Sequence, residues 1–316
     1  MRVCLFTEPH RGATYDTQLR LARHAEDAGF EGFFRADHYR SMGADAGLPG
    51  PTDAWLTLAG LARETSRIRL GTLVNSVTFR LPGPLAIMAA QVDAMSGGRI
   101  ELGLGAGWFE REHTAYGIPF PPRGERFDRL AEQLEIITGL WSAPGPYSYE
   151  GKHYRLVDAP ALPKPVQRPG PPIIVGGRGP RRTPDLAGRF ADEFNMPFRT
   201  VAETAEAFGR VREAASRYGR TVALSAGVVV ALGRTDREAG RRAAPLHVPS
   251  ALPPEDPVVG VPGVLVDRIA ELAAIGASRV YLRIIDMADL DHVDLIASDV
   301  LPAFTPGRRL HRPRSR

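Results

Sequence analysis

Short apolar runs alternate with amphipathic segments along almost the whole chain. Most of the runs are continuous and rich in Val, Ile, Leu and Phe, with little polar alternation. Continuous runs of this length are typical of strands that are buried on both faces, as in a parallel sheet covered by helices. The pattern predicts eight strands, over residues 3–7, 31–36, 68–76, 99–105, 172–177, 191–196, 222–232 and 278–286.

Helical patterns occupy the segments between these runs. One stripe of apolar residues runs from Tyr15 to Ala28 and stops at Gly29, which is typical of a helix C-terminus. The sequence "TVAE" at 200–203 has the spacing of a capping box, which predicts a helix start. Further helical stripes cover residues 85–95, 127–141 and 265–275.

Eight strand–helix units in 316 residues predict an α/β fold, a closed (β/α)₈ TIM barrel. An open doubly wound sheet is the alternative, because periodicity does not show closure. Two insertion segments interrupt the repeat. Residues 146–172 alternate like a hairpin and continue as a proline-rich arm, and residues 244–263 form a loop of the length typical of a lid. We expect one barrel domain over residues 1–304 and a basic disordered tail over 305–316.

Composition narrows the class of protein. With 43% hydrophobic and 24% charged residues, and no apolar run of about 18 residues, the chain is expected to be cytoplasmic and without a membrane partner. Cys4 is the single cysteine, so a disulfide within one chain is excluded. Five arginines in the last nine residues account for the formal net charge of +4, which becomes −1 without them. A nucleic-acid partner is therefore not expected.

Ionisable side chains follow several predicted strands at the ends where an α/β barrel carries its chemistry. Glu8 and His10 follow the first strand, and Asp37 and His38 follow the second. An imidazole titrates near neutral pH, so His38 is a candidate general acid or base, oriented by Asp37 or by another carboxylate. Glu8 is a second candidate for proton transfer. A structural histidine bonded to a backbone carbonyl is the alternative for His38, and Arg35 is expected in the barrel interior or in an ion pair.

No metal site is expected, because the eight histidines show neither His-x-x-x-His spacing nor a His-Cys-Cys set. Two glycine-rich turns follow the fourth and fifth strands, "GLGAG" and "VGGRGP". Backbone amides in such turns can hold a phosphate, so a phosphorylated cofactor tail lying across both turns is one hypothesis, and simple tight turns are the other. "GLGAG" is not a Rossmann fingerprint, because it follows the fourth strand and the next helical pattern begins only near Arg123.

Three segments carry a resemblance to a known family: "AEDAGFEGFFRADHY", "RIRLGTLVNSVTFRLPGPLAIMAAQVDAMSGGRIELGLGAGW" and "PPIIVGGRGPRRTPDLAGRFADEFN". Over roughly 300 residues the chain resembles the bacterial luciferase-like flavin-dependent oxidoreductases, and among them the branch that uses coenzyme F420, a deazaflavin. The resemblance implies a (β/α)₈ barrel, a homodimer and a small-molecule substrate. It also implies hydride transfer between F420 and an organic compound. An FMN-dependent monooxygenase supplied with reduced flavin by a separate reductase is the alternative, and a non-catalytic flavin-binding relative is a third.

The resemblance also implies particular site residues. A non-prolyl cis peptide at Leu73–Val74, continuing to Asn75, is expected to form a bulge behind the cofactor ring. Asp37 and His38 are expected to lie at the reacting edge of the ring. The phosphate site is implied at Gly105, Ala106, Gly107, Gly176, Gly177, Arg178 and Gly179.

Candidate substrate contacts are mainly aromatic. Trp108, Phe109 and Tyr39, with the segment 244–263, are expected to form a substrate wall, although packing explains large residues near a loop equally well. Arg283 could bind an acidic substrate group or a cofactor phosphate, or pair with Asp286 inside the barrel. Trp108 stands where the sugar-phosphate dehydrogenase branch carries an acidic residue, and the chain has only two lysines. Glucose 6-phosphate is therefore not the expected substrate.

Overall fold

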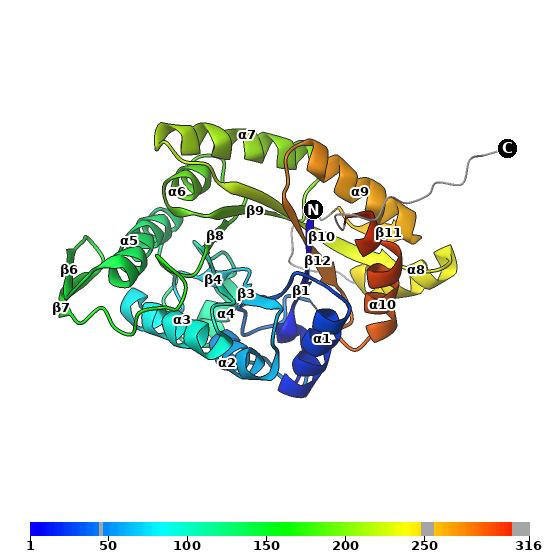
Figure 1. The fold of residues 1–316 in the computed structure, drawn as a ribbon, viewed down its shortest axis with the longest axis horizontal. Helices are drawn as coiled ribbons and strands as arrows, with labels where there is room; N and C mark the ends of the chain where they lie inside the picture. Colours follow the sequence, from blue (N-terminus) through cyan, green and yellow to red (C-terminus); the bar gives the residue numbers. More distant parts are fainter. Residues whose placement is uncertain (44–46, 248–255, 305–316) are drawn as a thin grey trace.

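The protein forms a closed barrel of eight parallel strands in a computed structural model, which describes residues 1–43, 47–247 and 256–304 (Figure 1). Closure comes from two pairings, β12 with β1 and β9 with β10. The (β/α)₈ prediction is therefore confirmed, and the open sheet is excluded. In barrel order the strands are β1 (Arg2–Thr7), β2 (Gly32–Arg35), β3 (Arg69–Thr72), β5 (Ile100–Gly105), β8 (Ile173–Gly176), β9 (Glu193–Pro197), β10 (Ala223–Leu232) and β12 (Arg279–Ile284).

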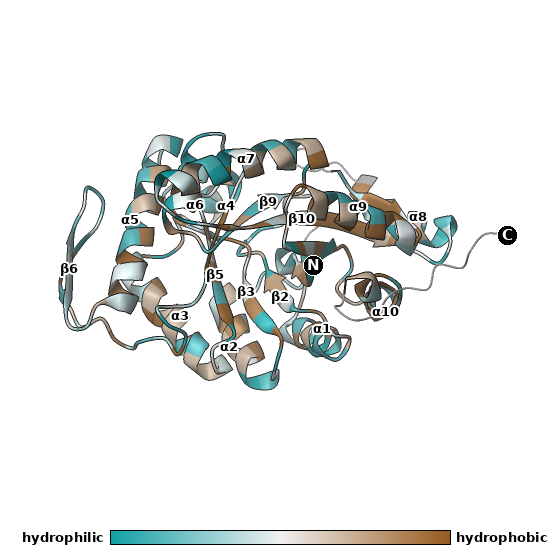
Figure 2. Ribbon diagram, turned by 45° about the horizontal axis from the view of Figure 1, so that its top comes forward, coloured by the Kyte–Doolittle hydropathy of each residue, from teal (hydrophilic) through white to brown (hydrophobic). Residues whose placement is uncertain are grey.

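Helices surround the barrel, and Figure 2 shows polar residues on their outer sides and apolar residues along the strands. The capping box is confirmed, because the Thr200 side chain and the Glu203 side chain each bond the other residue's backbone N–H. The helices are α1 (Tyr15–Asp27), α2 (Ala54–Glu64), α3 (Pro82–Ser96), α4 (Glu110–Ala115), α5 (Arg123–Ser142), α6 (Arg182–Phe190), α7 (Val201–Arg217), α8 (Asp236–Ala243), α9 (Pro262–Ala274) and α10 (Leu290–Asp299).

Of the two predicted insertion segments, residues 146–172 contain the expected hairpin, and residues 244–263 differ from the expected loop. An antiparallel hairpin of β6 (Tyr147–Glu150) and β7 (Arg155–Ala159) projects from one end of the molecule, as predicted (Figure 1). The segment 244–263, predicted to be a loop, contains a short strand that was not predicted. This strand, β11 (Val258–Gly260), pairs with β10 and extends the sheet. The rest of that loop, 248–255, and the tail, 305–316, lie outside the described residues. The short helix α4 starts directly after Phe109, so the expectation of no helix before Arg123 was wrong.

Side chains of β2 show how the barrel divides its two faces. Phe34 packs inside the barrel with Phe6 and Tyr281, whereas Phe33 belongs to the layer between strands and helices. Arg35 points to the same outer side as Phe33, where it is fully buried and donates hydrogen bonds to the start of α2 and the segment before it. The expectation that Arg35 lies in the barrel interior was wrong, because strand side chains alternate and Phe34 takes the inner position.

Charged side chains close the N-terminal end of the barrel. Arg279 is fully buried, and its Nη1 lies 2.6 Å from Oε2 of Glu101 and 3.1 Å from Oε2 of Glu193. The hydroxyl of Tyr281 donates to Glu193 at 2.6 Å. These residues sit at or near the first positions of β5, β9 and β12, so this end of the barrel is filled by an ionic cluster.

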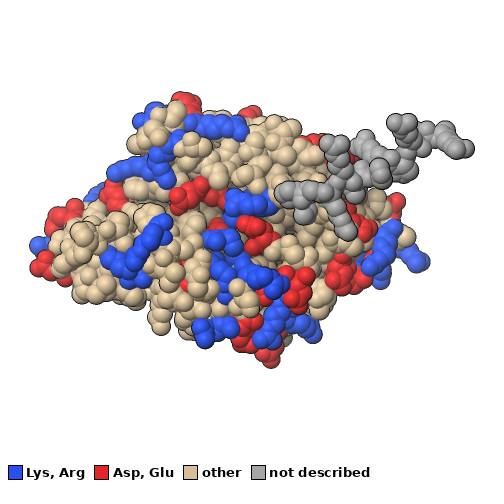
Figure 3. All heavy atoms as spheres, viewed as in Figure 1, with Lys and Arg blue, Asp and Glu red and all other residues tan. Residues whose placement is uncertain are grey.

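A two-residue strand, β4 (Asn75–Ser76), follows β3 after a break at Leu73 and Val74 and pairs with β5. Lys and Arg side chains are interspersed with Asp and Glu on the face seen in Figure 3. Among the described residues, no helix has the length and apolar character needed to span a bilayer.

Candidate functional site

The break between β3 and β4 is built around Val74. The Leu73–Val74 peptide is cis, as expected. A Cβ placed on Gly105 would lie 2.8 Å from Cγ2 of Val74, and one on Gly103 or Gly176 would lie 2.9 Å from its Cγ1. Such distances are shorter than real side chains tolerate, so these three glycines leave the space that the Val74 side chain fills. For Gly105 and Gly176, this packing role replaces a simple tight-turn explanation.

The remaining glycines of the two turns lie beside hydroxyl groups. Gly107 has φ +74°, and a Cβ there would lie 2.4 Å from Oγ of Ser76. Gly177 has φ +148°, and a Cβ on Gly179 would lie 2.6 Å from Oγ1 of Thr183, in the first turn of α6. Glycine turns lined by hydroxyls at a helix start are suited to bind an anion.

The two turns are adjacent, because a Cβ on Gly105 would lie 3.4 Å from the carbonyl oxygen of Gly176. Ala106, between the glycines of the first turn, packs against the core and offers its carbonyl to Arg126. Arg178 directs its Nε to the carbonyl of Pro197, at 3.2 Å. The residues implied for the phosphate site therefore lie together at the C-terminal ends of β5 and β8.

Arg126 on α5 is a site residue that the sequence did not single out. Its Nε donates to the Ala106 carbonyl at 3.2 Å, its Nη1 donates to Pro121 at 2.6 Å, and its guanidinium lies 3.8 Å from the centre of the Phe120 ring. Arg126 is buried, and among the described residues no carboxylate lies within ion-pair distance of it, although Glu110 is near enough to act on its charge. Burial lowers the pKa of this guanidinium. A buried cation without a counter-ion, held on the glycine turn, fits an anionic group bound there.

His38 is oriented by Glu112, a residue of α4. The His38 Nδ1 donates to Oε1 of Glu112 at 2.8 Å, and Oε2 of Glu112 accepts the backbone N–H of Tyr39 at 3.1 Å. Glu112 is almost fully buried. Because the carboxylate can only accept, Nδ1 carries a hydrogen and Nε2 is the nitrogen left to exchange a proton with a ligand.

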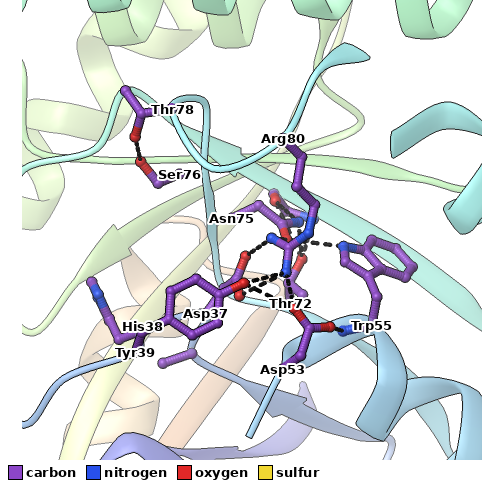
Figure 4. A network of polar contacts seen from close by, with 12 residues as sticks. Asp37, His38, Tyr39, Asp53, Trp55, Thr72, Asn75, Ser76, Thr78 and Arg80 are labelled. Carbon is purple, nitrogen blue, oxygen red and sulfur yellow. Dashed lines mark hydrogen bonds and ion pairs between the residues drawn. The ribbon is translucent and has the colours of Figure 1, made fainter. Parts of the chain in front are cut away.

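In the described part of the chain, the Asp37 carboxylate makes no bond to the His38 ring and pairs instead with Arg80 (Figure 4). Arg80 also pairs with Asp53 at 2.6 Å and donates to the Tyr39 hydroxyl at 3.0 Å. Of the two alternatives for the carboxylate that orients His38, Asp37 is excluded because Arg80 occupies both of its oxygens, and another carboxylate, Glu112, is the partner. Tyr39 is likewise held by Asp53 and Arg80 through its hydroxyl, so its ring contributes packing to the site.

Asn75 fixes the end of β3. Its Nδ2 donates to the Gly103 carbonyl at 2.8 Å and to Thr72, and its Oδ1 accepts from Nε1 of Trp55 at 3.1 Å (Figure 4). The side-chain amide is thus used inside the protein, and its contribution to a cofactor site is to hold the Val74 bulge.

Glu8 and Arg283 form a buried pair at the ends of β1 and β12, 3.4 Å apart. Burial would raise the pKa of Glu8, but Arg283 and other nearby cations outweigh it and hold the pKa below its usual value. Glu8 therefore stays ionised. The guanidinium of Arg283 lies 5.0 Å from the Phe198 ring. The expected pairing of Arg283 with Asp286 was wrong, because Arg283 pairs with Glu8, which directly follows the neighbouring strand β1.

Three rings surround His38 edge to face. The ring centres of His10, Trp108 and Phe109 lie 5.2, 5.9 and 6.2 Å from that of His38. Trp108 is 47% exposed and can meet a ligand, whereas Phe109 is buried and serves as packing. Burial lowers the pKa of His10 to about 3, so this ring is neutral at physiological pH. Of the expected aromatic wall, Trp108 is the member placed to touch a substrate.

In the described ranges, no group of three or more His, Cys, Asp or Glu side chains is arranged to hold a metal ion. The site thus combines a bulge at Val74, a glycine turn at Gly107 beside Arg126, and an imidazole paired with a buried carboxylate. Such a set can hold a phosphorylated ring compound and move one proton.

Curated proteins similar to this chain include F420-dependent and FMNH(2)-dependent enzymes. An F420-dependent glucose-6-phosphate dehydrogenase from Microbacterium testaceum is 37% identical over 54% of this chain and 49% of its own length. An F420-dependent hydroxymycolic acid dehydrogenase from Mycobacterium tuberculosis is 33% identical over 75% of this chain and 64% of its own length. An FMNH(2)-dependent dimethylsulfone monooxygenase from Pseudomonas putida is 30% identical over 71% of this chain and 60% of its own length. The aligned segments thus span between about half and two thirds of these relatives.

A solved structure of an F420-dependent secondary alcohol dehydrogenase, 18% identical, superposes with a TM-score of 0.81 over 96% of this chain and 98% of its own. This likeness concerns the fold. The family model for luciferase-like monooxygenases matches residues 1–279. The chain therefore belongs to the luciferase-like monooxygenase family.

Proposed function

We propose that the protein is an oxidoreductase that transfers a hydride between coenzyme F420 and a small organic substrate carrying a CH–OH or carbonyl group. The observation that carries the proposal is the pairing of His38 with Glu112, which lies on the short helix directly after the first glycine turn. Two of the relatives described above are named as F420-dependent dehydrogenases, which supports this cofactor.

The chain's own residues fit such a group. The glycine turns and Arg126 would hold the phosphate, and Val74 would support the ring from behind. When bound, the deazaflavin supplies a carbon that accepts or donates a hydride. Every other requirement falls on the protein, which has to position the substrate and manage one proton.

His38 manages that proton. Its Nε2 accepts the proton of a substrate hydroxyl when the substrate is oxidised, and returns it to a carbonyl oxygen in the reverse direction. The buried Glu112 carboxylate stabilises the imidazolium formed at His38 and fixes which nitrogen faces the substrate. Trp108 excludes water from one side of the imidazole and favours an apolar substrate group.

The first experiment is to purify the protein with its native cofactor and record the absorption spectrum, followed by titration with F420 and with FMN. Tight binding of F420, with hydride transfer from a panel of secondary alcohols, supports the proposal. Binding of FMN alone with oxygen consumption refutes it in favour of the monooxygenase, which the dimethylsulfone monooxygenase relative supports as the second candidate. Binding without turnover of any substrate would indicate a non-catalytic relative.

A further inference from the structure

A chain of hydrogen bonds runs from a buried histidine to the glycine turn that would hold the cofactor phosphate. His113 on α4 is fully buried. Its Nε2 lies 2.6 Å from Oγ1 of Thr78. Oγ1 of Thr78 in turn lies 2.6 Å from Oγ of Ser76 (Figure 4). The Ser76 hydroxyl lies against the glycine turn, because a Cβ added to Gly107 would be 2.4 Å from its Oγ.

The hydrogens in this chain can be assigned from its fixed end. Nδ1 of His113 lies 2.8 Å from the carbonyl oxygen of Phe109, which can only accept, so Nδ1 carries a hydrogen. In the neutral ring, Nε2 accepts a hydrogen bond from the Thr78 hydroxyl. The hydrogen bond between Thr78 and Ser76 must then be donated by the Ser76 hydroxyl. In this state the Ser76 hydrogen points away from the glycine turn.

Adding a proton to Nε2 reverses the chain. The imidazolium donates to Thr78, Thr78 donates to Ser76, and the Ser76 hydrogen is released toward Gly107, where it can bond an anion. We propose that binding of a phosphate-type anion at this turn takes up a proton on His113, and that Thr78 and Ser76 relay its effect to the anion. The inference refines the anion part of the site in the proposed function.

The surrounding charges favour this coupling. The elements packed on His113 carry Glu110, Arg111 and Glu112 on α4, Arg80 after β4, and Arg126 on α5, whose guanidinium lies on the Phe120 ring that also contacts His113. Arg80 is neutralised by Asp37 and Asp53, and Glu112 is bonded to His38 and the Tyr39 N–H. Arg126 has no ion-pair partner among the described residues, and Glu110 acts on its charge only from a greater distance. The positive charge of Arg126 opposes a second positive charge on His113. A bound anion would offset both positive charges.

The test uses sulfate, which carries no titratable proton near neutral pH, so any proton uptake belongs to the protein. Sulfate is added to the full chain in weakly buffered solution at pH 8, and uptake is read with an indicator dye. The expected result is uptake of up to one proton per bound sulfate, with an affinity that rises by up to about tenfold for each unit by which the pH falls. Thr78→Val is expected to bind sulfate with no uptake, because the Ser76 hydroxyl is then free at every pH.

Thr114→Val is the matched control and should keep the uptake, because Thr114 lies on the same helix and its hydroxyl donates to the Glu110 carbonyl, its single side-chain bond among the described residues. Sulfate addition without proton uptake in the wild type, or uptake that persists in Thr78→Val, would overturn the inference. A second measurement compares the pH dependence of F420 affinity in the wild type and in Thr78→Val. Failure of F420 to bind would refute the proposed function and leave the sulfate result standing.

Discussion

His38 and Glu112 are 74 positions apart in the chain and meet with 2.8 Å between Nδ1 and Oε1. The pair joins the C-terminal end of β2 to the short helix after β5. A buried carboxylate that accepts from Nδ1 holds one tautomer and stabilises the charged ring, so the residue that positions the proposed proton acceptor is Glu112.

Glu112→Gln should lower kcat for hydride transfer by about 10-fold to 100-fold, because the amide removes the charge that stabilises the His38 imidazolium. His38→Ala should lower it by about 10²-fold to 10⁴-fold. F420 affinity should change little in both, since neither residue lies at the phosphate turns. Pre-steady-state absorbance of the cofactor measures both effects. Glu110→Gln, on the exposed side of the same helix, is the control, and wild-type rates in Glu112→Gln would remove the role assigned to Glu112.

Gly105→Ala should destabilise the protein by about 1–3 kcal/mol, because its Cβ would meet the Val74 side chain at 2.8 Å. Val74→Ala in the same chain should recover part of that loss, since the next contact of the added Cβ, with the Gly176 carbonyl oxygen, is at 3.4 Å. Urea unfolding of the single and double variants measures the coupling. Gly83→Ala, with no atom within 4 Å of its added Cβ, is the control. Additive losses in the double variant would contradict the packing argument.

Arg126→Gln should weaken cofactor binding by about tenfold or more and reduce its sensitivity to salt, because the charge facing the anion is removed. Gln keeps part of the contact with the Ala106 carbonyl, so the turn itself should persist. Fluorescence titration with F420 at two salt concentrations measures the effect. Arg123→Gln, an exposed neighbour on α5, is the control. Equal salt dependence in Arg126→Gln and the wild type would show that Arg126 does not face the anion.

Much of the fold could be predicted from the sequence, because continuous apolar runs such as 222–232 mark buried parallel strands and Gly29 marks a helix end. The partners of the ionisable groups could not be predicted from the sequence. Asp37 stands next to His38 in the sequence, but successive side chains at a strand end point in different directions, and Arg80 captures Asp37. Within "FEREH" nothing distinguishes Glu112 from Glu110, because their difference is burial against β2.

Arg126 could not be singled out from the sequence for a related reason. It is one of many arginines in an arginine-rich chain, and its special feature is the lack of a carboxylate partner among the described residues. A missing partner leaves no sequence pattern. The resemblance to a family supplied the cis peptide at Leu73–Val74, which local residue preferences would not suggest.

We expect a homodimer, with a second copy covering the apolar surface of α2 and α3. Leu56, Leu81 and Ile87 in these helices or at their start are 78%, 63% and 48% exposed, which is unusual for a face that stays in water. Light scattering after gel filtration should give twice the mass of one chain. Leu56→Glu combined with Ile87→Glu should give a monomer, whereas Val259→Glu, at an exposed apolar site on β11, should not. A monomeric wild type would rule this surface out.

The ionic cluster at the N-terminal end of the barrel predicts a pH-dependent stability. Burial would raise the pKa of Glu101, but Arg279 and Arg69 outweigh it and hold the pKa below its usual value. A carboxyl with a lowered pKa in the folded protein stabilises it above the unfolded pKa of about 4.3, and this contribution is lost as the pH falls through the folded value. Glu101→Gln should therefore cost about 3–5 kcal/mol at pH 7, because Arg279 loses one of its two buried carboxylate partners and Arg69 also loses its contact with Glu101.

Glu193 is the matched comparison, because it is buried in the same cluster but its pKa is raised, burial being the largest cause. Its charged form is the less favoured one in the folded protein, and an amide at this position can still accept from the Tyr281 hydroxyl. Glu193→Gln should therefore cost clearly less than Glu101→Gln at pH 7. Urea unfolding at pH 7 and at pH 4 should show the Glu101→Gln deficit shrinking at the lower pH, because the carboxyl of the unfolded wild-type chain, with a pKa of about 4.3, takes up a proton there before the folded one does. A deficit that is the same at both pH values would mean that packing, and not the charge of Glu101, holds this end of the barrel together.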